Sequence, residues 1–485
     1  MKLSVNLKEN ERKIKEYCSS SADVVINKLK VGRHNCLVMW CDGMTNHLQC
    51  YEILYKQLYA VEPLRYLTPK SLYEHFTNSS NKLYDSKTTD NYEDLINKLM
   101  SGCVLLLIDG IDKGISVSAQ GYNFRAVSES YTEENVRSSR EGFVEPIKVN
   151  ITLVRRRIKS NLLVFESMQV GTISNTEISI AYLKDRVSQK LIKSIKQKLS
   201  KVDVELTLES GFVQPFLEPR KFSLFSSTGH TERPDTLCAK LLEGRVGIIV
   251  DGTPFALILP YLFSENFQSF DDYTNKPYYA SLIRILKYIA FAVSFLLPGL
   301  YVAIVYFNPE LLPSGMLLNI ARAQQNTSLP LLGEALFIHF IYEVVREAGL
   351  RLPRPIGHAV SLIGALVIGD AAVSAGIIAS PMVMTIALTS LCSFTIPMLY
   401  EPVTMLRLAF IIIGGLFGLV GITFALTAVL LNICALNSYG IPYMSPITPF
   451  SKPLFTDGFV RKGWTVHGGN SRQLTQMNGA HKLDE

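Results

Sequence analysis

Aspartate followed by glycine closes two apolar stretches of the chain. Asp251 ends GRVGIIVDG with its glycine, and Asp109 ends GCVLLLIDG in the same way. A carboxylate at the end of a buried strand is a common position for chemistry in α/β enzymes. Asp-Gly is also a turn signal, because glycine accepts positive φ and aspartate bonds the backbone that follows. Since the pair stands in both stretches, we interpret it as a shared turn and not as a catalytic acid.

The two stretches belong to a longer internal repeat. Residues 99–111 and 241–253 share the pattern L-x-x-G-x-V-x-x-x-x-D-G, and the same offset of 142 residues aligns the apolar segments 37–41 and 179–183. A constant offset over separate strands predicts the duplication of one α/β unit. The continuous apolar runs favour parallel strands that are buried on both faces.

No other group of residues has the spacing of a reactive site. His230 and Asp235 stand in one polar stretch, but no nucleophile is near them. The eight cysteines contain no CxxC pair, and no histidine stands at zinc-site spacing from them, so we expect ordinary buried thiols. We find no glycine-rich phosphate loop and no GxSxG motif. We therefore expect no cofactor, no metal and no enzymatic activity.

A basic cluster lies between the two copies of the repeat. Arg155, Arg156 and Arg157 precede Lys159 in LVRRRIK. Such runs bind nucleic acid or anionic lipid in some proteins, but most are solvated helix faces. No aromatic side chains alternate with the arginines to stack on bases, so we exclude nucleic acid. The three arginines remain candidates for contact with lipid headgroups or with another subunit.

Charge and hydropathy divide the chain sharply. The 485 residues are 48% apolar and 19% charged, but the charges concentrate in residues 1–284 and return after residue 436. The first thirty residues contain no apolar core segment, so we expect the N-terminal region not to be exported. We predict tandem soluble α/β domains followed by an all-α, multi-span membrane domain. The predicted boundaries are 1–140, 141–265, 266–436 for the membrane domain, and 437–485 for a hydrophilic tail.

Four apolar segments are long enough to cross a bilayer core of about 30 Å. They lie near residues 285–307, 359–379, 382–400 and 408–436. The last segment is overlong, which a tilted helix would accommodate. With four spans, the basic tail returns to the same side as the basic N-terminal region, and we expect both to be cytoplasmic.

The segment 329–349 is amphipathic. His339 and Glu343 belong to a polar face with helical spacing, and the other side is apolar. We favour a helix that lies flat at the membrane surface. The alternative is a helix that stands in the bundle with its polar face toward a water-filled path, which would place His339 and Glu343 on that path.

Asp370 is an acid deep inside a predicted span, within GDAAVSAG. A carboxylate in hydrocarbon is costly unless it faces protein or water. Small neighbours permit close helix contact. We consider Asp370 a candidate for an ion path, and the alternative is a hydrogen-bonded packing residue.

Four separated motifs resemble one known family in the same order. They are FVEPIKVNITLVRRRIK, RPDTLCAKLLEGRVGIIVDGTPFALILP, RLPRPIGHAVSLIGALVIGDAAVSAGIIASP and SFTIPMLYEPVTMLRLAF. These motifs closely resemble those of the A subunits of GerA-type spore germinant receptors. The resemblance covers about 145–437 well and the first repeat copy more loosely. The family commonly has Gln or Glu where Asp370 stands, and often Gln where His358 stands.

The resemblance implies a location and partners. Family members lie in the inner membrane of bacterial endospores, with the N-terminal domain on the core side. They act with a transporter-like B subunit, thought to hold the nutrient, and with a lipoprotein C subunit. The A subunit is thought to self-associate into a nutrient-gated ion path, in which a ring of acidic side chains such as Asp370 would favour cations.

Three alternatives remain open. Stage V sporulation protein AF, an accessory ion-release or transport protein, belongs to the same family and fits the motifs nearly as well. A secondary transporter component would need inverted repeats in the membrane half, and we see none. A membrane-anchored enzyme would need a catalytic constellation, which the sequence lacks.

Overall fold

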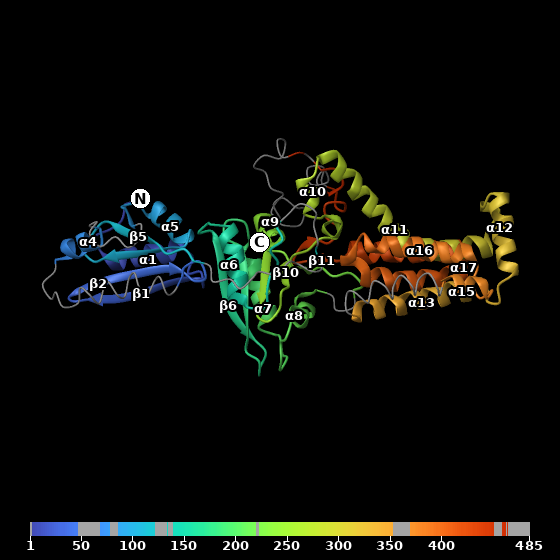
Figure 1. Cartoon of the computed structure of the whole chain (residues 1–485), viewed down its shortest axis with the longest axis horizontal. Coiled ribbons are helices and arrows are strands. Elements are labelled where there is room, and N and C mark those ends of the chain that lie inside the picture. Colours follow the sequence, from blue (N-terminus) through green and yellow to red (C-terminus); the bar gives the residue numbers. More distant parts are fainter. Residues whose placement is uncertain are drawn as a thin grey trace.

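The chain is elongated, with two α/β units at one end and a bundle of long helices at the other (Figure 1). This order confirms the predicted fold class. The sequence of residues 44–60, which follows the apolar segment 37–41, predicts a helix, and most of these residues lie outside the described ranges. The computed structural model describes residues 2–46, 68–77, 86–121, 133, 139–219, 223–352, 369–450, 458–461 and 463.

Each α/β unit contains one five-stranded sheet. In the first unit the strand order is β1-β2-β4-β5-β3, and in the second it is β6-β7-β9-β10-β8. The two orders are equivalent, so the topology confirms the duplication. The first sheet consists of β1 (Val24–Val31), β2 (His34–Cys41), β3 (Ser86–Thr89), β4 (Cys103–Ile108) and β5 (Gly114–Ser118). The second consists of β6 (Leu163–Val170), β7 (Thr176–Leu183), β8 (Gly229–Thr231), β9 (Val246–Val250) and β10 (Ala256–Leu259).

The prediction of parallel strands is wrong, because every strand pair in both sheets is antiparallel. The apolar runs are continuous because helices cover both faces of each sheet. The first sheet lies between α4 (Pro69–Thr77) on one face and α1 (Leu7–Tyr17) with α5 (Tyr92–Met100) on the other. The second lies between α7 (Gln189–Leu199) with α8 (Ser210–Leu217) and α6 (Ile147–Arg157) with α9 (Pro234–Leu242).

Helix α7 shows how the sequence builds such a layer. Ser188 caps its start by accepting a hydrogen bond from the Lys190 N–H at 3.3 Å. Leu191, Ile195 and Leu199 recur at spacings of four and pack into the core of the second unit, while most of the lysines face outward.

Two described helices are long and apolar enough to cross a membrane. They are α11 (Pro277–Phe307) and the stretch Pro397–Ala435, which contains α17 (Tyr400–Ala435). They contain the predicted span 285–307 and all but the last residue of the predicted span 408–436. A shorter apolar helix, α16 (Ser380–Phe394), covers most of the third predicted span.

The remaining predicted span, 359–379, is described only from residue 369 onward, where α15 (Gly369–Ser374) begins. The helix α12 (Ser314–Gln325) lies at the tip of the bundle farthest from the α/β units (Figure 1). The helix α13 (Leu331–Arg351) packs along α11, α16 and α17. This is the arrangement of the alternative in which 329–349 stands in the bundle.

Helix α17 is not one tilted rod. Gly418 interrupts it with φ 61° and ψ −150°, a conformation restricted almost to glycine. Before Gly418, α17 follows α11: an added Cβ on Gly414 would touch the Gly299 backbone, and one on Gly418 would touch the Phe307 ring. After Gly418 the chain returns to the second α/β unit. There the Tyr443 N–H donates to the Leu436 carbonyl, and the Phe263 N–H donates to the Tyr443 carbonyl. The overlong segment is therefore two helical halves that reverse direction.

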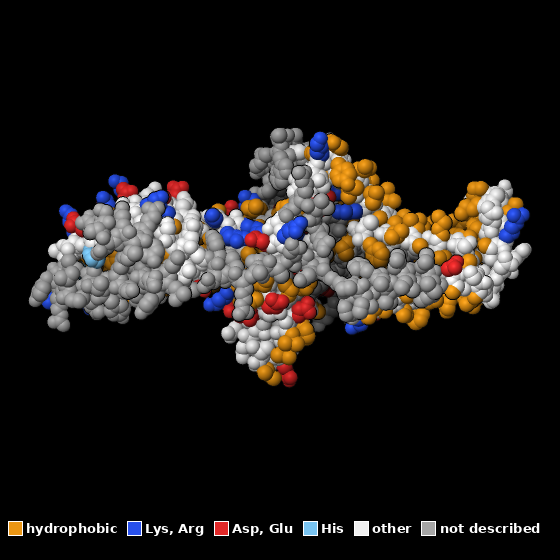
Figure 2. Space-filling view, viewed as in Figure 1, with side chains coloured by type: hydrophobic (Ala, Val, Ile, Leu, Met, Phe, Trp, Pro, Cys, Tyr) orange, Lys and Arg blue, Asp and Glu red, His pale blue; other side chains and the backbone are white. Residues whose placement is uncertain are grey.

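The tail begins at the same end of the bundle as the α/β units. After α17, β11 (Asn437–Ser438) and β12 (Ile441–Pro442) form a small ladder. Ile441 is buried in the core of the second unit, and Tyr443 packs against Phe263. Figure 2 shows hydrophobic side chains over much of the visible face of the bundle, whereas most visible charges lie on the α/β units.

Candidate functional site

The aspartate of each Asp-Gly pair makes a hydrogen bond within its own α/β unit. Asp109 Oδ1 accepts a hydrogen bond from the Leu7 N–H at 3.2 Å, and Asp251 Oδ1 accepts one from the Ile147 N–H at 2.9 Å. Leu7 and Ile147 are the first residues of α1 and α6. A carboxylate at a helix start satisfies a free N–H and interacts favourably with the helix dipole. Asp109 and Asp251 therefore make equivalent contacts in the two units, so Asp251 has a structural role, as we infer from the repeat.

Arg155 joins the two repeat copies from inside. Its side chain is fully buried, and its Nε lies 2.6 Å from Asp23 Oδ2 of the first unit. Its other nitrogens donate to Asp23 Oδ1 at 3.1 Å, to the Ser160 carbonyl at 2.7 Å and to the Leu163 carbonyl at 2.9 Å. The guanidinium group therefore has its partners within this chain, and none of it reaches the surface where a lipid or a subunit would bind.

Arg156 and Arg157 stay nearer the surface. Both pair with Glu141, Arg157 at 2.7 Å. Burial alone would raise the pKa of Glu141, but the hydrogen bonds and positive charges of the two arginines hold that pKa below its ordinary value. The two arginines thus belong to a partly exposed ion-pair group and remain accessible to a partner.

A second polar group lies inside the apolar bundle, where α13 faces α17. The Tyr400 hydroxyl donates to Glu343 Oε2 at 2.9 Å, and Arg346 Nε donates to the same carboxylate at 3.0 Å. The Arg346 guanidinium also lies over the Tyr400 ring, 4.2 Å from its centre. Arg407 Nη1 lies 3.9 Å from Glu343 Oε1. We call Glu343, Arg346, Tyr400 and Arg407 the bundle cluster.

Arg407 is the most deeply buried member of the bundle cluster, with 0% of its surface exposed. Its Nε donates to the Ser294 carbonyl in α11 at 2.7 Å. This carbonyl lacks its helical donor, because residue 298, four positions later, is proline and has no N–H. Arg407 Nη1 and Nη2 find no hydrogen-bond acceptor in the described structure. A buried cation with free donors in an apolar bundle is costly, and it marks a functional position more often than a packing one.

His339 is buried on α13, one turn before Glu343. Within the described residues, its Nδ1 and the hydroxyl of the neighbouring Tyr342 find no hydrogen-bond partner. The Arg407 guanidinium lies over the Tyr342 ring at 5.8 Å. The structure thus brings both α13 candidates, His339 and Glu343, to the side of α13 that faces the bundle.

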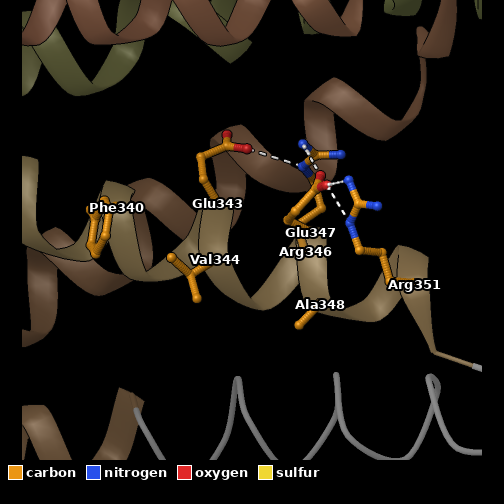
Figure 3. Close-up of a pocket in the computed structure, with 7 residues that line it drawn as sticks. All are labelled: Phe340, Glu343, Val344, Arg346, Glu347, Ala348 and Arg351. Atoms are coloured by element: carbon orange, nitrogen blue, oxygen red, sulfur yellow. Dashed lines mark hydrogen bonds and ion pairs between the residues drawn. The ribbon is translucent and has the colours of Figure 1, made fainter.

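An open hollow is lined by seven residues of α13 (Figure 3). Glu343, Arg346, Glu347 and Arg351 form a chain of ion pairs there: Arg346 reaches Glu347 at 3.7 Å and Arg351 reaches it at 2.6 Å. Glu343 and Arg346 therefore belong both to this surface and to the bundle cluster. The chain of ion pairs therefore extends from the hollow to Arg407.

Asp370 lies apart from this cluster. It stands on the short helix α15 with an exposed side chain, while Ala372 of the same helix packs into the bundle. His358, the other position singled out by the resemblance, lies outside the described residues.

Sequence reasoning missed Tyr400 and Arg407. Arg407 immediately precedes the apolar segment 408–436, so it reads as a flanking charge. The signal available in the sequence is Pro298: a proline inside an apolar helix leaves a carbonyl that needs a donor from another helix. Only the packing of α17 on α11 identifies that donor.

The duplicated α/β units are joined to a bundle with two helices that are long and apolar enough to cross a membrane, and this combination suggests a class of protein that associates with a membrane through its C-terminal half. The chain belongs to the Bacillus/Clostridium GerA spore germination protein family, whose model matches residues 12–472. The described residues contain no group of three or more His, Cys, Asp or Glu side chains that would hold a metal ion.

Two individual relatives agree with the family match, and one solved structure is also similar. Spore germination protein KA of Bacillus subtilis (strain 168) is 36% identical over 467 residues, which cover 95% of this chain and 85% of that protein. Stage V sporulation protein AF of the same organism is 29% identical over 379 residues, which cover 77% and 76%. The crystal structure of the N-terminal domain of the A subunit of the Bacillus megaterium spore germinant receptor GerK3 has 32% identity and a TM-score of 0.45, and covers 54% of this chain and 98% of that one.

Proposed function

We propose that the chain is the membrane subunit of a nutrient germinant receptor, and that its bundle forms part of a nutrient-gated ion path. The protein would lie in the inner membrane of the endospore with its α/β units on the core side. It would act with a transporter-like B subunit, a lipoprotein C subunit and further copies of itself. The family match over residues 12–472 supports the receptor role.

The bundle cluster is the observation that carries the ion path. Charged and polar side chains that are buried between apolar helices face either protein or water, and in membrane proteins they mark ion and proton routes. Glu343 is held by Tyr400 and Arg346 and lies near Arg407, so its charge is balanced in this state. A shift of α13 against α17 would separate these groups and would open a polar route from the bundle cluster to the hollow along α13.

Asp370 supports assembly of several copies. Its carboxylate is exposed on α15, next to the apolar surface of the bundle. Hydrocarbon does not solvate a carboxylate, which favours a neighbouring copy or a water-filled space beside Asp370. A ring of such carboxylates would favour cations.

Cation release from spores tests the proposal. Spores with Glu343→Gln and spores with Asp370→Asn are exposed to a nutrient mixture, and released potassium is recorded. Glu310→Gln is the matched control, because Glu310 is an exposed acid of the helical half that belongs neither to the bundle cluster nor to the hollow. We expect slower release from both variants and normal release from the control. Normal release from both variants, at normal protein levels, would remove the two residues from the path.

The second candidate function is an accessory ion-release protein, and the match to stage V sporulation protein AF favours it. Deletion of the chain separates the two functions. Loss of the response to one nutrient class supports the receptor subunit, whereas a slowed response to every nutrient supports the accessory protein. Co-purification of the B and C subunits with the tagged chain tests the receptor complex directly. A nutrient uptake assay in vesicles tests the remaining alternative, a transporter component.

A further inference from the structure

The first three turns of α11 leave the bundle at an angle. In Figure 1, α11 begins above the second α/β unit, beside α10 (Asp271–Thr274), and descends obliquely before it joins the other helices. Along this part, an outer row of apolar side chains points away from the protein. The outer row consists of Tyr278, Leu282, Ile285 and Ile289, whose spacing of three and four residues places them on one side of the helix.

The outer row is strongly exposed. Tyr278 has 72% of its surface exposed, Leu282 62% and Ile289 59%. Tyr279 and Leu286 flank the row and are exposed as well. Figure 2 shows hydrophobic side chains along the oblique part of α11. Contiguous apolar surface of this kind marks a membrane or protein contact.

The opposite side of the same turns is fixed to the protein. Arg284 is fully buried, and its Nε lies 2.7 Å from Asp272 Oδ2 of α10. Lys287 donates to the Ser269 hydroxyl at 3.1 Å. The helix therefore cannot rotate the outer row toward the protein without breaking a buried ion pair.

The C-terminal tail strengthens this attachment. Arg461 donates to the backbone carbonyls of Tyr273 at 2.9 Å and of Asn275 at 2.8 Å, and its N–H donates to the Ser281 hydroxyl at 2.9 Å. Phe459 stacks on the Tyr288 ring at 4.4 Å between ring centres. The segment that directly precedes α11 and a distant part of the tail thus hold the oblique turns in one orientation.

We propose that residues 276–289 form an interfacial foot that lies in the membrane–water boundary on the side of the α/β units. The outer row enters the region between lipid headgroups and acyl chains, while the buried side binds α10 and the tail. The proposal rests on the membrane placement of the bundle and adds a specific lipid contact to it.

Continuity within α11 favours lipid as the occupant. The same helix runs on without a break into the apolar residues 290–307, and each residue adds about 1.5 Å along the axis. The outer row therefore stays within about 18 Å of the span. The exposed side of this segment carries Lys276 and no acidic residue, which suits anionic headgroups, whereas Arg284 and Lys287 face α10. Tyrosines at its outer end match the aromatic belt of membrane proteins.

Tryptophan quenching in vesicles tests the foot. The full chain carries Trp40→Phe and Trp464→Phe, which removes both native tryptophans. Leu282→Trp and Ile289→Trp are introduced one at a time, and the protein is placed in vesicles of phosphatidylglycerol and phosphatidylethanolamine. We expect brominated lipid to reduce the emission of both probes and aqueous iodide to leave it unchanged. Val5→Trp, on the exposed surface of the first α/β unit, should show the reverse.

A fourth probe separates the foot from the membrane placement itself. Phe424→Trp lies on the exposed side of α17, where 73% of Phe424 is accessible. Quenching of Phe424→Trp by brominated lipid without quenching of the two foot probes would overturn the inference and leave the bundle in the membrane. Absence of lipid quenching at Phe424→Trp would overturn both. Foot probes that neither quencher reaches would show that protein covers the outer row, which also contradicts the inference.

Discussion

Arg407 of α17 donates its Nε–H to the Ser294 carbonyl of α11 at 2.7 Å, and thereby replaces the N–H that Pro298 lacks. A helix kinked by proline leaves a carbonyl that must find a donor when no water is near. The same guanidinium group lies beside Glu343 of α13. One side chain therefore connects the missing helical hydrogen bond of α11 with the charged face of α13.

This relationship predicts coupling between Pro298 and Arg407. Arg407→Met leaves the Ser294 carbonyl without a donor, which should cost about 1–3 kcal/mol. Pro298→Ala restores the helical N–H, so the cost of Arg407→Met should be smaller in that background. We expect a coupling of about 1 kcal/mol, read as a difference in thermal unfolding in detergent. Arg346→Met is the control, because Arg346 donates to no carbonyl of α11, and its effect should be additive with Pro298→Ala.

The buried pair of Arg155 and Asp23 should stabilise the two α/β units as one body. Removing one partner of a buried pair leaves an uncompensated charge, so Asp23→Asn should lower the free energy of unfolding by about 3–5 kcal/mol. Lys148→Ala is a matched control between the same units, since Lys148 pairs with Asp42 at 3.5 Å but is 76% exposed. The control should change the free energy by about 0–1 kcal/mol. Equal effects of the two substitutions on urea unfolding would show that the buried pair of Arg155 and Asp23 stabilises the units no more than the exposed pair does.

The contact between α11 and α17 depends on two glycines that face each other. An added Cβ on Gly414 would lie 2.4 Å from the Gly299 carbonyl oxygen, and one on Gly299 would lie 2.4 Å from that of Phe410. Because both neighbours are backbone, Gly414→Ala should force the helices apart and cost about 1–3 kcal/mol. Gly315→Ala in α12 meets no atom within 4 Å and should be neutral or slightly stabilising. Thermal unfolding of the two variants, measured side by side, checks this difference.

Buried thiols should resist labelling. Burial raises the pKa of Cys18, Cys36 and Cys238 to about 12 each. The thiolate is the reactive form, so its fraction stays very small as the pH rises from 7 to 9. We expect maleimide to spare these three cysteines in the native chain and to label them in guanidinium chloride. Rapid labelling at pH 7 without denaturant would contradict the burial of the α/β cores.

Part of the fold is readable from the sequence, because the information is local or periodic. The repeated Asp-Gly turns and apolar runs indicate two copies of one unit, and the equivalent sheet orders confirm them. The same runs mislead about strand direction, since helices on both faces bury an antiparallel sheet as completely as a parallel one. The length of the segment 408–436 suggests a single tilted span, but Gly418 reverses it.

The candidate site was only partly accessible to sequence reasoning. His339 and Glu343 follow from the polar face of an amphipathic helix, and the structure places both on the side of α13 that faces the bundle. The basic cluster of three arginines looks uniform in the sequence. In the structure Arg155 is wholly internal, while Arg156 and Arg157 share Glu141 near the surface.

The sequence by itself determined the repeat, the division into a charged half and an apolar half, and the family, because periodicity, composition and motif order are properties of neighbours along the chain. The tertiary structure alone decided the direction of the strands, the reversal at Gly418, the buried pair of Arg155 and Asp23, and the contact between Arg407 and Ser294. Each of these depends on which distant groups meet. A buried donor or charge chooses its partner by three-dimensional proximity, which no local pattern encodes.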